Sequence, residues 1–100
     1  MSLVLLTFIA PARLEDDMVE LLLSHPQLAS GFTVSAAEGH GSDLAFQGIA
    51  DQVRGREKRV RIECVIDAAQ AQALASLVKN RLPNCNIVFW VASLMEFGKC

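Results

Sequence analysis

The sequence has 100 residues, of which 52% are hydrophobic, and its net charge of −2 corresponds to a pI of about 5.6. This length suits a single domain over residues 1–100, and so large an apolar fraction in so small a chain predicts self-association. The acidic pI and the scarcity of aromatic residues argue against nucleic-acid binding, and no apolar run approaches the ~20 residues of a membrane-spanning helix. We therefore expect a cytoplasmic domain that neither binds nucleic acid nor inserts into a membrane.

The charged residues are unevenly distributed along the chain. Residues 1–53 contain seven acidic residues and one basic residue, whereas residues 54–100 contain eight basic and four acidic residues. Much of the basic excess falls in one short run, which consists of Arg54, Arg56, Lys58, Arg59 and Arg61. Such a run is either a solvated face or a site for an anion. Neither a disulfide framework nor a zinc ribbon is predicted, because no CxxC pair occurs among the three cysteines, Cys64, Cys85 and Cys100.

The first half of the chain is predicted to form a strand, a helix and a second strand. Residues 3–9 are apolar on both alternating faces, as in a strand that is covered on both sides. Pro11 ends this strand, and a helix follows at about 13–24 with a buried stripe of Leu14, Met18, Leu21 and Leu22. The second strand is predicted at 32–37, and an excursion without steady period follows at about 38–57. Loops longer than ~12–15 residues in a compact domain are usually functional or disordered.

The second half repeats the order strand, helix, strand. Residues 58–66 alternate between apolar and polar side chains, which predicts the third strand. Asp67 and Gln70 form a plausible capping box for the second helix, whose buried stripe is predicted as Ala71, Leu74, Ala75, Val78 and Leu82. The pair Pro83-Asn84 ends this helix, and the last strand is predicted at about 86–94.

This order of elements, β-α-β-β-α-β, predicts an α+β fold with a four-stranded antiparallel sheet and both helices on one face. The other face of the sheet would then be bare and apolar. We expect it to carry Val4, Leu6 and Phe8 of the first strand with Val88, Trp90 and Ala92 of the last, or the alternates of these residues. An open apolar face predicts that subunits bury it against one another.

Several segments resemble the PII signal-transduction proteins in the same order along the chain. Residues 9–16 (IAPARLED) resemble the end of the first PII strand and the start of its first helix. Residues 31–34 (GFTV) and 39–41 (GHG) are similar to the second strand and to the glycine pair that opens the long T-loop, and residues 60–66 (VRIECVI) resemble the strand on which that loop returns. The stretches 52–56 (QVRGR) and 89–91 (FWV) are similar to a divergent bacterial PII-like subfamily.

The resemblance implies a ferredoxin-like subunit in a homotrimer, with clefts between neighbouring subunits. In PII proteins these clefts take adenine nucleotides, and the T-loop, here 38–57, docks onto a transporter or an enzyme. Thr33, Gly39 and Gly41 fall at positions that the family uses near its ligand. The chain also departs from the family, because it has no tyrosine and because residues 82–86 (LPNCN) replace the glycine-rich phosphate loop.

Residues 39–41 are the first candidate site. Gly39 and Gly41 let backbone N–H groups approach an anion, as in a nest. His40 between them could contact a ligand, titrate near neutral pH or bind a divalent or soft metal ion. The alternative is an ordinary turn between a strand and a loop.

A second candidate site consists of Arg54, Arg56 and Lys58. Guanidinium groups suit phosphate or carboxylate, and these side chains could replace the missing phosphate loop. Alternatively they contact a protein partner, or keep a strand edge soluble. Trp90 is interpreted as subunit packing rather than base stacking, and Cys64 as a core residue.

These patterns favour a regulator over an enzyme, because no nucleophile motif, Walker loop or HExxH occurs. The first hypothesis is a PII-like sensor that binds a small ligand, with an adenine nucleotide implied by the resemblance, and that controls a transporter or an enzyme through its loop. The second is a metal-handling trimer of the divalent-cation-tolerance type, linked to heavy-metal efflux. The third is a protein-interaction adaptor without a ligand.

Overall fold

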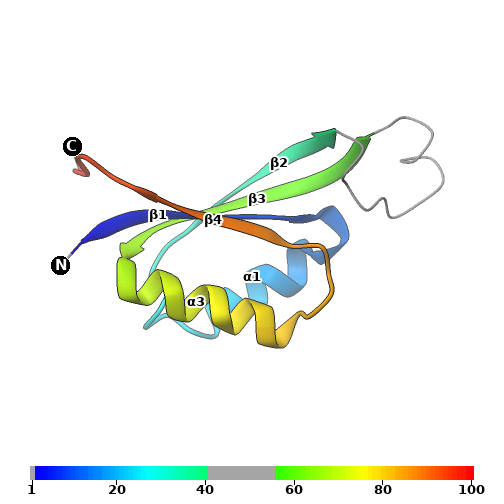
Figure 1. Ribbon diagram of the computed structural model, residues 1–100, viewed down its shortest axis with the longest axis horizontal. Helices are drawn as coiled ribbons and strands as arrows, with labels where there is room; N and C mark the ends of the chain where they lie inside the picture. The colour runs from blue at the N-terminus through cyan, green and yellow to red at the C-terminus, as the bar shows by residue number, and fades with distance from the viewer. Residues whose placement is uncertain (1, 41–55) are drawn as a thin grey trace.

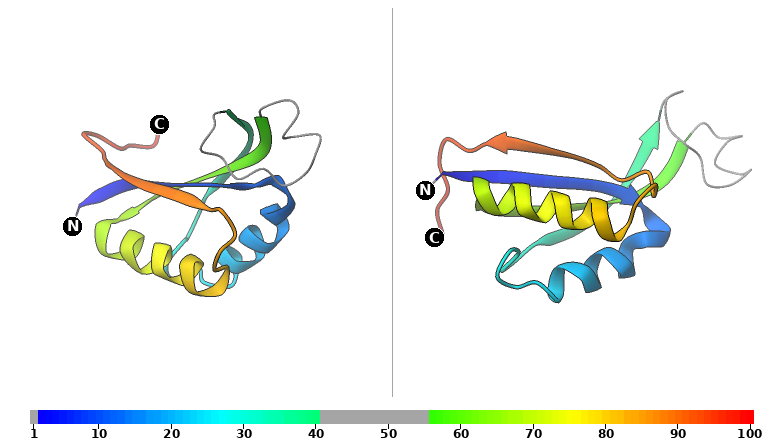
Figure 2. Two further views of the ribbon diagram at one scale, coloured as in Figure 1. Left: turned by 45° about the vertical axis from the view of Figure 1, so that its right-hand side comes forward. Right: turned by 60° about the horizontal axis from the view of Figure 1, so that its bottom comes forward.

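The computed structural model describes residues 2–40 and 56–100, and these form one layer of sheet covered by one layer of helices. The elements are β1 (Leu3–Pro11), a 3-10 turn (Ala12–Leu14), α1 (Glu15–Leu23), β2 (Thr33–His40), β3 (Arg56–Asp67), α3 (Ala68–Arg81) and β4 (Val88–Ser93). The strands are antiparallel in the order β2-β3-β1-β4, and α1 and α3 lie on the same face of the sheet (Figures 1 and 2). The predicted ferredoxin-like α+β fold is therefore confirmed.

The core lies between the sheet and the two helices. β1 pairs with β3 on one side and with β4 on the other, so its side chains Leu6 and Phe8 are fully enclosed. Met18 and Leu22 of α1 and Leu74 of α3 cover them from the helix layer. The predicted stripes of both helices point into this core, although Leu21 and Leu82 are only partly buried.

The N-terminus of α3 has the capping box that the sequence predicts. The Asp67 carboxylate accepts a hydrogen bond from the backbone N–H of Ala69 at 3.1 Å, and the Gln70 side chain accepts one from the backbone N–H of Asp67 at 3.2 Å. Asp67 also accepts a hydrogen bond from the backbone N–H of Ser2 at 3.1 Å. One side chain thus starts the helix and fixes the beginning of β1 beside it.

The register corrects which residues of β1 occupy the open face. Leu6 pairs with Val91 and Phe8 with Phe89, and paired residues lie on the same face of a sheet. Val4, Leu6 and Phe8 therefore face the helices, and the open face carries their alternates Leu5, Thr7 and Ile9. Of the two sets that the sequence allowed for β4, Val88, Trp90 and Ala92 occupy the open face.

Several predicted boundaries were wrong by a few residues. β2 continues to His40 and β3 begins at Arg56, so the ends of the expected 38–57 excursion are strand residues, and Gly39 pairs with Glu57. The partner strand supplies the hydrogen bonds that offset the poor strand propensity of glycine. The rest of the excursion, including Gly41 and Arg54, lies outside the described residues. β4 begins only at Val88, because Asn86 has a φ of 57° that no strand residue adopts.

Candidate ligand site on the open sheet face

A hollow of about 540 Å³ lies on the open face of the sheet, near the end of β1 and the start of β4. We call it the outer-face hollow. All four strands contribute to its lining, which consists of Ile9, Ala37, Glu38, Gly39, Arg59, Arg61, Asn86, Ile87, Val88 and Trp90. Its volume is in the range of small-molecule sites, which measure about 300–1,000 Å³.

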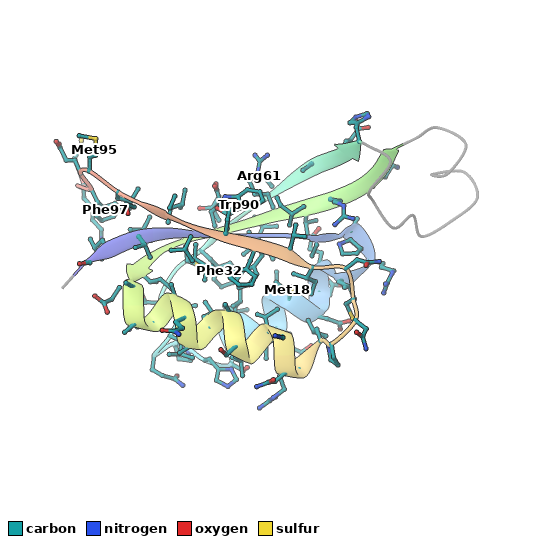
Figure 3. The ribbon with its side chains drawn as sticks, in the orientation of Figure 1. Met18, Phe32, Arg61, Trp90, Met95 and Phe97 are labelled. Atoms are coloured by element: carbon teal, nitrogen blue, oxygen red, sulfur yellow. The ribbon has the colours of Figure 1, made fainter. Side chains whose placement is uncertain are left out.

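Alternation along the strands brings the polar groups of the hollow together. Ile9 pairs with Arg61 on one side and with Val88 on the other, so these three side chains share one face. Trp90 and Arg61 lie on the side of the sheet opposite Met18 (Figure 3). The hollow therefore combines an apolar floor with guanidinium groups at its wall.

Arg59 is the most enclosed charged residue of the hollow, with only 4% of its surface exposed. Its guanidinium donates a hydrogen bond from Nη1 to the backbone oxygen of Asn86 at 3.1 Å. Arg61, two residues along β3, is exposed on the same face. Two neighbouring guanidinium groups favour a carboxylate or phosphate ligand, which arginine can bind through two parallel hydrogen bonds.

The segment between α3 and β4 has a backbone shape that glycine usually provides. Asn84 has a φ of 58° and Asn86 a φ of 57°. Asparagine tolerates this left-handed region better than other residues with a β-carbon. Residues 82–86 therefore form a tight turn although they contain no glycine. Arg59 stabilises this turn through its hydrogen bond to the Asn86 carbonyl.

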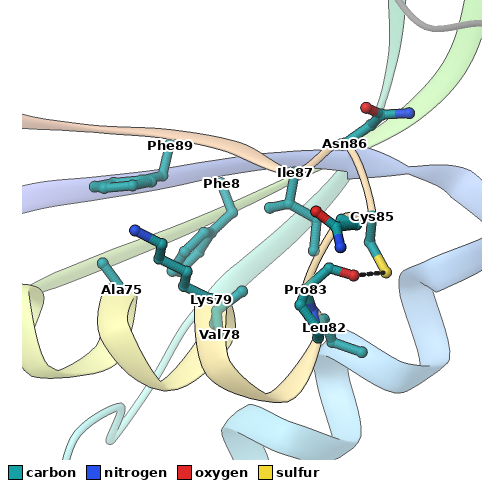
Figure 4. A pocket seen from close by; sticks show the side chains of 11 residues that line it. Phe8, Ala75, Val78, Lys79, Leu82, Pro83, Cys85, Asn86, Ile87 and Phe89 are labelled. Carbon is teal, nitrogen blue, oxygen red and sulfur yellow. Dashed lines mark hydrogen bonds between the residues drawn. The ribbon is translucent and has the colours of Figure 1, made fainter.

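A second cavity, of about 300 Å³, lies under the same turn on the helix side of the sheet (Figure 4). Val78 of α3 and the rings of Phe8 and Phe89 form part of its apolar wall, with ring centroids 6.2 Å apart. Asn86 and Ile87 line both this cavity and the outer-face hollow. The two residues just before β4 thus form a shared wall between two cavities on opposite faces.

The structure separates the residues that the sequence singled out. Gly39 lines the outer-face hollow, whereas Thr33 is exposed on the same face opposite Glu63. His40 is exposed at the end of β2. Because Gly39 and His40 are in a strand, their successive N–H groups point in opposite directions, and the expected nest is not formed by these two residues.

Lys58 lies in a different place from the outer-face hollow. It lines a third hollow, of about 560 Å³, together with Glu15, Ala36 and Glu38. Arg56 is the first residue of β3, paired with His40. The strand therefore places the basic residues in different sites: Lys58 faces the helix-covered side, whereas Arg59 and Arg61 line the outer-face hollow.

Sequence reasoning did not select Arg59, Arg61 or Trp90 for the ligand site. The alternation in 58–66 already placed the two arginines on one face, but Trp90 joins them only through the register of two strand pairs. No cluster of three or more His, Cys, Asp or Glu residues that could hold a metal ion occurs in 2–40 and 56–100. The metal role of His40 stays a prediction.

Burial of Cys64 raises the pKa of its thiol and should lower its reactivity. This side chain lies in the core, where desolvation raises its thiol pKa from 9.0 to about 11. We expect thiol reagents to modify Cys85 and Cys100 at pH 8 and to leave Cys64 unmodified in the folded protein, because the thiolate is the reactive form.

The raised pKa also predicts how stability depends on pH. Above pH 9 the unfolded chain loses the Cys64 proton while the folded chain keeps it, so the free energy of unfolding falls as the pH rises from about 9 to about 11. Denaturant unfolding of wild type and Cys64→Ala over this range measures the effect. The difference in stability between the two should shrink with rising pH, and a constant difference would contradict the assignment.

Comparison with known proteins identifies the family. The model of a family of unknown function, DUF3240, matches residues 1–100. The chain belongs to the DUF3240 family. No curated protein matches its sequence.

Several solved structures share the fold of this chain. A DUF3240 protein from Shewanella baltica OS155 is 21% identical, with a TM-score of 0.79 over 100% of this chain and 98% of the other. CPII from Thiomonas intermedia K12 is a nitrogen regulatory PII-like protein whose structure contains ADP, AMP and bicarbonate. It is 16% identical, with a TM-score of 0.72 over 100% of this chain and 97% of the other.

CutA from Synechococcus elongatus PCC7942 has the same fold. It is 15% identical, with a TM-score of 0.67 over 93% of this chain and 77% of the other. This DUF3240 chain thus shares its fold with PII-like proteins and with CutA. In the part of the chain that the structure describes, neither helix is long and apolar enough to cross a membrane.

Proposed function

We propose that this DUF3240 chain is a cytoplasmic, non-enzymatic regulator that binds a small anionic ligand and passes its state to a transporter or an enzyme. The outer-face hollow carries the proposal, because Arg59 and Arg61 flank an apolar floor that ends at Trp90. A ligand with a flat apolar part and an anionic part fits such a lining. An adenine nucleotide has both parts and is the first candidate.

The PII-like fold suggests how the subunits assemble and how ligand binding reaches a partner protein. The subunits are proposed to form a homotrimer in which the hollow lies at a junction between subunits. The bound ligand is proposed to alter docking on the partner through the segment that connects β2 to β3. CPII, whose structure contains ADP and AMP, supports a nucleotide as the ligand class.

Thermal unfolding tests the ligand. We expect millimolar ATP, ADP or AMP in metal-free buffer to raise the melting temperature by several degrees, because a ligand at a hundredfold excess over its Kd stabilises the folded state by about 2.7 kcal/mol. Arg61→Gln should reduce this rise, since it removes an exposed guanidinium from the hollow. Arg81→Gln, an exposed arginine at the end of α3, should leave the rise unchanged.

The alternatives give different outcomes in the same assay. Stabilisation by copper or zinc but by no nucleotide would favour the metal-handling hypothesis. Silence with every nucleotide and metal would favour the ligand-free adaptor. A nucleotide shift that is equal in wild type and Arg61→Gln would place the ligand outside the outer-face hollow.

A further inference from the structure

The cavity under the turn before β4 has the features of a separate small-molecule site, and we call it the inner cavity (Figure 4). It measures about 300 Å³, which is the lower end of the range for ligand pockets. It reaches solvent, because Lys79 and Asn84 in its lining are exposed. Voids much larger than a water molecule are rare beside a protein core, so we expect a space of this size to hold an occupant.

Small side chains on α3 keep the inner cavity open. Phe89 of β4 lies on the helix-covered face of the sheet, yet it is 51% exposed. Ala75 of α3 lines the inner cavity together with Phe89, and Ala71 and Ser76 line the neighbouring hollow along α3 together with the same ring. A large side chain at these positions of α3 would cover the ring, whereas alanine and serine leave it as a free apolar wall.

Two aromatic rings and a valine form a firm part of this wall. The rings of Phe8 and Phe89 have centroids 6.2 Å apart and planes inclined at 45°. Phe8 is 1% exposed and Val78 is 3% exposed, so the core holds both side chains in place. A planar ring that enters the cavity can meet one of the two phenylalanines edge to face or offset, as aromatic pairs prefer. The wall therefore suits an aromatic group.

One cationic side chain stands at the rim. Lys79 lines both the inner cavity and the neighbouring hollow along α3, so it lies at the boundary between the two. Among the described residues that line the inner cavity, Lys79 is the only charged one, and none is acidic. An ammonium group beside an apolar cavity attracts an anion while the cavity accepts an uncharged body. A single ammonium matches a single negative charge.

We infer that the inner cavity binds a small aromatic monocarboxylate, with its ring against Phe8 and Phe89 and its carboxylate at Lys79. The inner cavity and the outer-face hollow lie on opposite faces of the sheet, and among the described residues they share only Asn86 and Ile87. This site is therefore distinct from the one that carries the proposed function, and the two can be tested separately.

A titration with benzoate, followed by amide chemical shifts in NMR spectra at pH 7, tests the site. Equal concentrations of sodium chloride serve as the blank. We expect saturable shifts at the amides of Val78, Lys79 and Phe89, which line the inner cavity, and none at Arg61 in the outer-face hollow. Acetate has the charge without the ring and benzamide has the ring without the charge, so both should bind more weakly than benzoate.

Variants separate the two parts of the site. Lys79→Gln should weaken benzoate binding roughly fivefold, as expected for loss of an ion pair at a partly exposed site. Arg81→Gln is the matched control, because it removes a charge two residues further along α3, outside the inner cavity, and it should bind benzoate like wild type. Ala75→Leu should fill the cavity and abolish binding without loss of helix propensity.

The opposite results would overturn the inference. These are shifts that do not saturate, shifts confined to residues outside the inner cavity, or equal affinity in wild type and Lys79→Gln. Shifts at Phe89 that follow the protein concentration and not benzoate would assign the cavity to a neighbouring copy and overturn it as well. Arg61→Gln should bind benzoate like wild type, so a failure of nucleotide binding is distinguishable from a failure of the inner cavity.

Discussion

Replacing Leu22 by alanine should lower the free energy of unfolding by about 3–5 kcal/mol, whereas the same change at Leu23 should alter it by less than about 0.5 kcal/mol. The two leucines are neighbours in α1, but Leu22 is 0% exposed and Leu23 is 65% exposed. Truncating Leu22 removes buried methyl groups and leaves a cavity between α1 and the sheet. Truncating Leu23 removes atoms that already contact water.

Denaturant unfolding followed by circular dichroism measures both variants. The chain concentration must be the same for all proteins, because self-association adds to apparent stability. Leu→Ala removes the same atoms at both positions of one helix, so helix propensity contributes equally. Equal losses at the two positions would show that α1 does not pack against the sheet through the Met18–Leu22 face.

Replacing Trp90 by aspartate should break the assembly. Trp90 projects from the open face beside Val88, where the proposed trimer buries it. A tryptophan at the centre of an interface typically contributes 2 kcal/mol or more, which corresponds to a roughly 30-fold weaker dissociation constant. The aspartate adds an unpaired charge to the same surface, so the loss should exceed this value.

Light scattering over a dilution series measures this loss. Leu23→Asp is the matched control, since it places the same charge on an exposed leucine of α1, away from the open sheet face. The control should keep the wild-type mass at every concentration, and circular dichroism should show that both variants are folded. A Trp90→Asp protein with wild-type mass would mean that the open face is not buried between subunits.

The sequence was sufficient to predict the elements but not how they align. Local patterns predicted the capping box of Asp67 and Gln70 and the stripe that buries Leu74, because each depends on residues a few positions apart. The face occupied by Phe8 depends on pairing with Phe89, which is far away in the chain. A shift of one residue in register exchanges the two faces, so sequence alternation alone left both assignments open.

The candidate site was harder to predict for the same reason. The basic run suggested an anion site, but it did not show that Arg59 is enclosed or that its guanidinium reaches the Asn86 carbonyl. This contact joins β3 to the turn before β4 across 27 positions of the chain. The sequence also did not reveal that Asn84 and Asn86 adopt the left-handed backbone conformation, because a turn of this kind was expected to contain glycine.

The pairing of β2 with β3 has a mechanical consequence. The ladder has eight described pairs, from Thr33 with Glu63 to His40 with Arg56. A force that pulls the two strands apart at the His40 end loads the hydrogen bonds of one residue pair at a time, so the pairs separate one after another at low force. A force directed along the strands stretches all eight pairs together and meets high resistance. A partner bound near His40 would therefore separate β2 from β3 far more easily by pulling across the strands than by pulling along them.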